Sequence, residues 1–493
     1  MRPSGPLAQS AGRGRGRGPG RGPAVAIVQE HDSDYDYVYD YDYVQVQVQV
    51  QVQVHVQVHV RLEGVAEIVM GIPHGSGGGA PDGAGAGTLA PGVPLGVYVH
   101  FPFCGVHCPY CDFAVEVRAE IPHDAYADAV VAEIAARRPW FAGAGALQSI
   151  YFGGGTPGLW RPGALARVID AACAAFGAAG APARSALEIT VEANPGEVDQ
   201  PRLEALARAG VNRLSLGAQA FDDRQLRALG RNHDAAAIPV AVAAARAAGI
   251  DNLSLDLMFG IPDQTLADWQ RGVDACVALE PAHVSAYALT IERGTPFGAL
   301  DRAGRLPRAG DDDVAAMFEH GRQTLAAAGL AHYEVSSYAR PGHRARHNSL
   351  YWQAAGAAYL GVGASASSFR PLADGTGRRF ANPRATATYL RAARAGAGSP
   401  APVHVEHRAA TDLENEALWL ALRTVDGVDR QTHRLRYGRD PLEGRAAPIA
   451  RCQRAGWLIV DDAQLRLTPA GFLFADEVAT RLWREPAGDN VPR

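Results

Sequence analysis

The stretch LGVYVHFPFCGVHCPYC, residues 95–111, joins an apolar run to three closely spaced cysteines. The run 95–101 reads as a buried strand, and Cys104, Cys108 and Cys111 follow it with C-x3-C-x2-C spacing. Thiolates are soft ligands that suit iron–sulfur clusters or zinc. A loop this short lets three sulfurs converge on one cubane and leaves the fourth iron open to another ligand. The stretch therefore predicts a [4Fe–4S] cluster directly after a strand.

A structural zinc site is the alternative, with His107 or His100 as the fourth ligand. Zinc sites usually pair two ligand clusters a dozen or more residues apart, and the sequence has no second C-x2-C. The remaining cysteines, Cys173, Cys276 and Cys452, are scattered singly. Cys173 and Cys276 fall in Ala-rich helical stretches, so we expect them to be small buried residues. The pattern favours the cluster.

Short apolar runs alternate with Ala-rich helical stretches beyond residue 95. The runs are 95–101, 149–152, 187–192, 213–217, 253–258 and 284–289, and the helical stretches are 124–137, 163–176, 201–209, 235–248 and 266–279. Strands that alternate with helices of about ten residues or more indicate a parallel α/β sheet. Six such units predict an α/β fold, a partial (β/α)6 barrel of the TIM type over residues 95–330.

Polar and glycine-rich positions collect where these runs end. GGGTP at 153–157 follows the second run, EANPG at 192–196 ends the third, and Gln219 lies past the fourth. Asp256 and Tyr287 lie in the fifth and sixth runs. In such barrels the chemistry lies at the C-terminal ends of the strands, so we expect these residues to share a site with the cysteines.

The composition restricts the class of protein. The 493 residues suffice for two or three domains, and the net charge of -5 gives no global basic field that attracts nucleic acid. No apolar run reaches the ~20 residues of a membrane helix, and no signal peptide is visible. Six cysteines are too few in a chain this long for a disulfide framework. We expect a cytoplasmic protein without a nucleic-acid partner.

Residues 1–94 differ from the rest of the chain in composition. They hold an Arg–Gly repeat, an Asp–Tyr alternation and a Gln–Val alternation, followed by a stretch of mostly Gly, Ala and Pro. Such simple repeats seldom specify a unique core. One interpretation is an interaction or RNA-binding tail. The favoured one is a disordered or mis-annotated in-frame extension, with Met70 closer to the true start, and we assign it no function.

The cysteine spacing, with Tyr110 just before the third cysteine, resembles the radical S-adenosylmethionine superfamily. The resemblance implies that the open iron chelates the amino and carboxylate groups of the methionine part. An electron from the cluster then cleaves the sulfonium to give a deoxyadenosyl radical. It also implies that the segment 153–157 lies along the methionine part, which suits glycines because they let a ligand approach the backbone closely.

The region from Val97 to about Phe369 resembles the oxygen-independent coproporphyrinogen oxidase family more closely. The matching stretches are 98–104, 153–157, 192–195, 216–219, 229–231 and 256–262. The resemblance implies S-adenosylmethionine contacts at Tyr98, Gly154, Gly155, Thr156, Glu192, Gln219, Arg231 and Asp256.

Two features favour the HemW branch of that family. The oxidases carry a fourth cysteine where this chain has Phe113, and His347-Asn-Ser-Leu-Tyr-Trp352 resembles the H-N-x-x-Y-W motif of HemW proteins. The resemblance implies a heme chaperone, with His347 as candidate heme ligand, since neutral imidazole is a common axial ligand. The competing interpretation makes His347 a satisfied polar residue and the aromatic residues part of the core.

The implied partners are heme, apo-hemoprotein clients such as respiratory enzymes at the membrane, and an electron donor if the cluster is reduced. The rival function is that of an enzyme, the oxygen-independent coproporphyrinogen III oxidase, which decarboxylates its substrate by a radical route. Radical chemistry on an unrelated substrate is a third option, because a fold alone never fixes the substrate.

The C-terminal part reads as a barrel extension, 331–400, followed by a domain of its own, 401–493. Residues 396–402 form a linker rich in Gly, Ala and Pro, and 413–422 is an amphipathic helix. The stretches 457–460 and 464–467 predict a small hairpin, and Thr468 caps a last helix over 469–483. We therefore expect a small, mainly α, winged-helix-like domain of the same family, too acidic at its hairpin to bind DNA.

Overall fold

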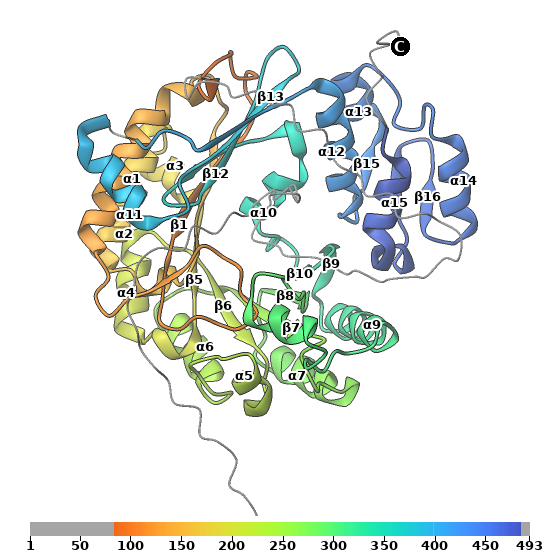
Figure 1. Ribbon diagram of the computed structural model, residues 1–493, viewed down its shortest axis with the longest axis horizontal. Helices are drawn as coiled ribbons and strands as arrows, with labels where there is room; N and C mark the ends of the chain where they lie inside the picture. Colours follow the sequence, from red (N-terminus) through yellow and green to blue (C-terminus); the bar gives the residue numbers. More distant parts are fainter. Residues whose placement is uncertain (1–82, 398, 485–493) are drawn as a thin grey trace, which may run out of the picture. The chain divides into compact units, whose positions relative to one another are not determined.

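The computed structural model describes residues 83–397 and 399–484. The predicted repeats and Met70 lie outside the described residues. Within them, a large sheet with surrounding helices comes first, and a small mainly helical domain follows it in dark blue (Figure 1).

The large sheet has twelve strands in the order β14-β13-β12-β11-β1-β4-β5-β6-β7-β8-β10-β9. Seven neighbouring strands are parallel: β11 (Ala358–Val362), β1 (Leu95–Phe101), β4 (Leu147–Gly154), β5 (Glu188–Ala193), β6 (Arg213–Gln219), β7 (Asn252–Phe259) and β8 (His283–Ala288). The last six coincide within two residues with the predicted apolar runs. All of β1 is buried, as strands covered on both faces of a parallel sheet are. The predicted partial barrel is confirmed.

The five predicted helices form on the outer side of these strands (Figure 1). They are α1 (His123–Arg137), α2 (Pro162–Ala175), α4 (Gln200–Ala209), α6 (Ala237–Ala247) and α7 (Leu266–Ala278). Shorter or later ones are α3 (Ala181–Ser185), α5 (Asp223–Ala228), α8 (Pro296–Arg302) and α9 (Asp311–Ala327). Cys173 on α2 and Cys276 on α7 are buried, as expected. Among the described helices, none is long and apolar enough to cross a bilayer.

The sheet extends beyond the six predicted strands at both edges. One edge gains β10 (Ser337–Ala339) and β9 (Ala331–Glu334), and the other gains β11, β12 (Ser367–Pro371), β13 (Gly377–Ala381) and β14 (His404–Arg408). The helices α10 (Arg346–Trp352) and α11 (Thr386–Ala392) lie between them in sequence. Strand β14 falls in the predicted C-terminal domain, yet it pairs with β13. Runs as short as β11 do not reveal by periodicity whether they are strand or helix.

Residues 83–94 correct the predicted boundary of the low-complexity segment at 94. Leu89 is buried and forms a β-bridge with Leu372. The buried guanidinium of Arg370 donates to the backbone carbonyls of Ala84, Ala86 and Gly87, and to that of Trp140. Arg370 holds this segment through its backbone, and few of its side chains pack in the core. Apolar periodicity therefore does not reveal it.

The C-terminal domain combines four helices with a three-stranded sheet of order β15-β17-β16. The helices are α12 (Ala410–Leu422), α13 (Arg430–Tyr437), α14 (Ala446–Arg454) and α15 (Ala475–Leu482), and the strands are β15 (Val428–Asp429), β16 (Leu458–Val460) and β17 (Gln464–Leu467). The predicted hairpin is β16–β17. The predicted last helix, 469–483, divides into a 3-10 turn, Ala470–Phe474, and α15. Only glycine fits at 471, because a Cβ there would collide with the Trp457 carbonyl.

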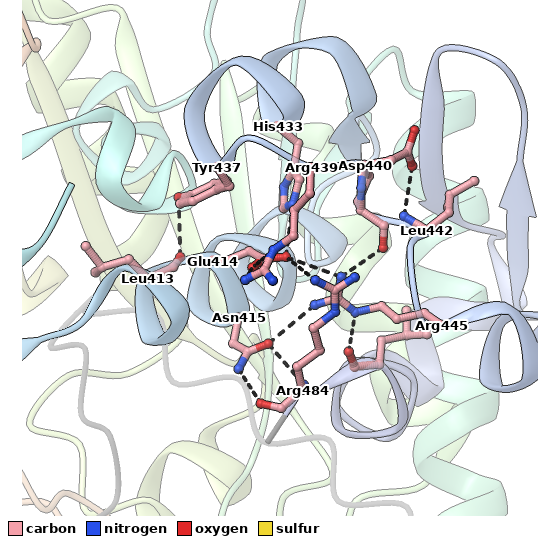
Figure 2. A network of polar contacts seen from close by, with 12 residues as sticks. Leu413, Glu414, Asn415, His433, Tyr437, Arg439, Asp440, Leu442, Arg445 and Arg484 are labelled. Atoms are coloured by element: carbon pink, nitrogen blue, oxygen red, sulfur yellow. Dashed lines mark hydrogen bonds and ion pairs between the residues drawn. The ribbon is translucent and has the colours of Figure 1, made fainter. Parts of the chain in front are cut away.

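A buried carboxylate, Glu414 on α12, organises this domain (Figure 2). Arg439 Nε donates to Glu414 Oε2 across 2.7 Å, and Arg484 Nη1 and Arg445 Nη1 lie 3.2 and 3.4 Å from Oε1. Burial alone would raise the pKa of Glu414, but His433 and the arginines lower it to about 2. The ionised carboxylate therefore joins α12 to the segments that follow it.

Candidate functional site

One cavity lies at the carboxyl ends of the parallel strands. Its walls contain all three clustered cysteines and seven of the eight residues with a predicted S-adenosylmethionine contact. The shared lining is Cys104, Cys108, Cys111, Gly154, Gly155, Thr156, Glu192, Gln219, Arg231 and Asp256. Chemistry in barrels collects at this end of the strands, and the structure brings the predicted residues together there.

The cysteine loop is held beside the first strand. Cys104 ends the short strand β2 (Phe103–Cys104), which pairs with β3 (Glu116–Val117), and the Cys111 amide donates to the Cys108 carbonyl across 3.1 Å. Burial raises the pKa of Cys104 to about 11 and that of Cys111 to about 12. A metal that binds these thiols displaces their protons.

The two histidines considered as zinc ligands are engaged elsewhere. His100 contacts Tyr98 OH through Nδ1 and the Ala114 carbonyl through Nε2, and His107 Nε2 contacts the Cys111 carbonyl. In the described part of the chain, no three His, Cys, Asp or Glu side chains are grouped closely enough for a single metal ion. The donor set, three thiolates with C-x3-C-x2-C spacing in one loop, fits a cluster.

Two glycines at the end of β4 let the backbone pack closely against its neighbours. Gly154 has φ 111°, which favours glycine, and a Cβ there would meet the His100 ring. A Cβ at Gly155 would lie 2.6 Å from the Phe103 carbonyl oxygen and 3.0 Å from Cys104 Sγ. The backbone at Gly155 therefore lies directly against the cysteine loop, where a side chain would collide with it.

Two carboxylates line the cavity, Glu192 from β5 and Asp256 from β7, with β6 between these strands. Tyr151 OH donates to Glu192 Oε1 across 2.6 Å. Ser215 Oγ donates to Asp256 Oδ2 across 2.8 Å, and Ser254 Oγ donates to Asp256 Oδ1 across 3.2 Å. Burial raises the pKa of Asp256 against these hydrogen bonds. Buried carboxylates with fixed orientations suit the hydroxyl and amino groups of a polar cofactor.

Strand β6 ends in a bulge that places Gln219. The register with β7 shifts between Leu216 and Gln219, and Gln219 has φ 62°. Such strain in a non-glycine residue is typical of functional sites. A Cβ at Gly217 would lie 3.0 Å from side-chain nitrogens of both Arg231 and Gln219. Gly217 thus leaves the space in which these two polar side chains meet.

Tyr98 is the one predicted cofactor residue outside the cavity lining. It is buried on β1, and its ring stacks on Tyr151 with centroids 6.2 Å apart. Its hydroxyl contacts His100 Nδ1 at 3.1 Å. In this structure Tyr98 packs against Tyr151, and its contact with S-adenosylmethionine stays a prediction.

His347, the predicted heme ligand, also lies outside the cavity lining. Its Nδ1 contacts Ser149 Oγ at 2.8 Å and its Nε2 contacts Tyr351 OH at 2.9 Å. The ring is 1% exposed and stacks on Tyr151 with centroids 5.0 Å apart, and burial lowers its pKa to about 3. Both ring nitrogens are thus occupied, as the competing interpretation of a satisfied polar residue expects.

Several residues of the cavity wall have no role predicted from the sequence, among them Tyr151, Asn194 and Ser215. Asn194 follows the end of β5, within the quoted EANPG segment. Its position was a usable signal, because polar residues that follow parallel strands share one edge of the sheet. Tyr151 and Ser215 lie inside strands, where composition alone does not separate cavity from core.

The sequence matches two family models, Radical SAM superfamily over residues 98–275 and HemN C-terminal domain over residues 409–474. The cavity with its three cysteines lies within the first region. The fold and the site therefore define a radical SAM protein with a HemN-type C-terminal domain. The family implies a [4Fe–4S] cluster and S-adenosylmethionine.

Curated relatives identify the branch. The chain is 36% identical over 344 residues to Heme chaperone HemW of Synechocystis sp., covering 68% of this chain and 79% of the relative. It is 38% identical over 284 residues to Heme chaperone HemW of Escherichia coli, covering 57% and 72% respectively. The chain belongs to the HemW family.

A solved structure supports the fold. Coproporphyrinogen III oxidase (HemN) from Escherichia coli, a radical SAM enzyme, aligns with a TM-score of 0.67 over 81% of this chain and 92% of its own. The two sequences are 21% identical, so this likeness establishes the fold and leaves the activity open.

Proposed function

We propose that this protein is a heme chaperone, which binds heme and delivers it to apo-hemoproteins. The observation that carries the proposal is the similarity to relatives named heme chaperone HemW, of which the chain covers 79% and 72%. Phe113 adds support, because it lines the cavity at the position where the resemblance places a fourth cysteine in the oxidases.

The proposed cofactors are one [4Fe–4S] cluster on Cys104, Cys108 and Cys111, and S-adenosylmethionine in the adjoining cavity. When bound, this pair supplies one-electron chemistry at the sulfonium. The hydrogen-bonded carboxylates Glu192 and Asp256, which line that cavity together with the three cysteines, support the assignment.

Heme ligation by His347 requires that one ring nitrogen give up its hydrogen-bond partner, either Ser149 at Nδ1 or Tyr351 at Nε2. The structure offers a matched control for this proposal. His283 is equally buried, with Nδ1 2.9 Å from Ser254 Oγ and Nε2 2.9 Å from Tyr333 OH. If His347 binds heme, its substitution must weaken heme binding more than substitution of His283, which has a similar polar environment.

The test is a heme titration of the anaerobically reconstituted full chain, followed by absorbance, for wild type, His347→Ala and His283→Ala. Conversion of coproporphyrinogen III is assayed on the same preparation. The proposal expects saturable, stoichiometric heme binding without conversion. Conversion of the porphyrinogen, or no saturable binding by the wild type, would return the chain to the oxidase class.

The two variants test His347 as the axial heme ligand, independently of the chaperone proposal. Weaker heme binding by His347→Ala alone supports His347 as the axial ligand. An equal effect of both substitutions, or none, removes His347 from the heme site and leaves the chaperone proposal intact. The apo-hemoprotein clients, such as respiratory enzymes at the membrane, an electron donor for the cluster and a cytoplasmic location belong to the same proposal.

A further inference from the structure

Asn194 lies between two side chains that reach the cluster cysteines. It follows β5, just before the 3-10 turn Pro195–Glu197, and lines the cavity. Its amide contacts Thr156, Arg231 and Glu197. These contacts form a continuous path from Cys104 to Cys108 through Thr156, Asn194 and Arg231.

The partners of Asn194 fix the orientation of its amide. The Arg231 guanidinium has only donors, so it must meet the amide oxygen, Oδ1. An ionised Glu197 carboxylate has only acceptors, so it must meet Nδ2, which lies 2.7 Å from Glu197 Oε2. The reversed amide would lose both contacts.

That orientation determines where the hydroxyl hydrogen of Thr156 points. Asn194 Nδ2 donates to Thr156 Oγ1 across 3.2 Å. The hydroxyl has one hydrogen of its own, and Cys104 Sγ lies 3.6 Å away as its acceptor. A donor at Asn194 therefore leaves the Thr156 hydrogen directed at the first cluster cysteine.

The same amide holds Arg231 toward the second cysteine. Arg231 Nη2 donates to Asn194 Oδ1 and to the Gly217 carbonyl. Its Nη1 donates to Cys108 Sγ across 3.6 Å and lies 3.4 Å from Tyr110 OH. The Nη2 contacts thus leave Nη1 aimed at sulfur.

We propose that Asn194 is a positioning residue that directs hydrogen bonds from Thr156 and Arg231 onto the thiolates of Cys104 and Cys108, and so raises the reduction potential of the cluster. Hydrogen bonds to cluster sulfurs tune the potential, and residues that orient such donors act through them. These hydrogen bonds stabilise the extra negative charge of the reduced cluster. The proposal rests on the cluster assigned under the proposed function.

The experiment measures the midpoint potential of the reconstituted cluster in the full chain by anaerobic dithionite titration with electron paramagnetic resonance. In Asn194→Asp a carboxylate still accepts from Arg231 but also attracts the Thr156 hydrogen, so Cys104 loses its donor. Thr156→Val removes that donor directly, and Thr156→Ser restores it. The matched control is Asn232→Asp, because Asn232 Nδ2 donates to the same Glu197, across 2.7 Å.

The expected result is a lower potential in Asn194→Asp and Thr156→Val, with Thr156→Ser and Asn232→Asp near the wild-type value. Because Asn194 and Thr156 act on one thiolate, the double variant should shift less than the sum of the two. An unchanged potential in Thr156→Val, or an equal shift in Asn232→Asp, would overturn the proposal. A wild-type chain that assembles no cluster would instead defeat the cluster assignment itself.

Discussion

Tyr151 on β4 and Glu192 on β5 join two adjacent strands in the lining of the cavity, with the Tyr151 hydroxyl donating to Glu192 Oε1 across 2.6 Å. Tyr151 is 6% exposed and also stacks on His347 and Tyr98. The Glu192 carboxylate is therefore oriented by the hydroxyl of Tyr151, whose ring is held by Tyr98 and His347.

Tyr151→Phe should weaken S-adenosylmethionine binding without preventing cluster assembly. The variant keeps the stacked ring and loses only the hydroxyl that orients Glu192. A hydrogen bond to a charged group contributes about 1.5–3 kcal/mol, so we expect roughly a tenfold or greater loss of affinity in calorimetric titration. Tyr437→Phe, which removes a hydroxyl hydrogen-bonded to the Leu413 carbonyl in the C-terminal domain, is the control and should bind as wild type does.

Cys104→Ala should abolish the cluster, whereas Cys173→Ala should leave it in place. Both residues are free thiols, but Cys104 lines the cavity and Cys173 is buried on α2. Iron content and visible absorbance after reconstitution distinguish them. Retention of a full cluster in Cys104→Ala would contradict the ligand assignment.

Glu414→Gln should strongly destabilise the C-terminal domain at neutral pH. It leaves Arg439, Arg445 and Arg484 without their shared carboxylate, and removing one partner of a buried ion pair costs about 3–5 kcal/mol. Urea unfolding of the apoprotein measures the loss. The exposed Glu443 of the same domain provides the control, Glu443→Gln, which should change stability little.

The Glu414 contribution should also depend on pH. Its folded pKa, about 2, lies below the ordinary value of about 4.3 for glutamate. A depressed pKa stabilises the fold above the unfolded value, and this stabilisation is lost as pH falls from about 4.3 toward 2. The stability difference between wild type and Glu414→Gln should therefore shrink over that range in a series of urea melts. A constant difference would contradict the role of the ionised carboxylate.

Glu334→Gln should stabilise the chain at pH 8 and leave it nearly unchanged near pH 4.5. Glu334 ends β9, forms a β-bridge with Thr424, and burial raises its pKa to about 7. An acid with a raised folded pKa lowers stability as pH rises from about 4.3 to 7, by at most roughly 4 kcal/mol here. Thermal melting of wild type and variant at both pH values tests the sign. A variant less stable than wild type at pH 8 would show that Glu334 is paired when ionised.

The alternation of strands and helices, and the edge of the sheet that carries the cavity, could be predicted from the sequence. Apolar runs and polar residues at strand ends are local signals. The positions of β11 and of residues 83–94 could not be predicted, since β11 is five residues long and Arg370 acts from nearly 300 residues away in sequence. The hydrogen-bond partners of His347 could not be predicted either, because they are far away in sequence. Ser149 lies on β4, and Glu188, which accepts from the His347 amide, lies on β5.

The clamp formed by Arg370 sets where the chain can be shortened. A truncation that begins at residue 95 leaves a buried guanidinium facing three missing carbonyls, whereas one that begins at 83 keeps every acceptor. The shorter protein is then expected to be less soluble and to melt earlier. The glycine-rich residues 83–94, ahead of the first barrel strand, therefore belong in any shortened chain, although their composition gives no sign of it.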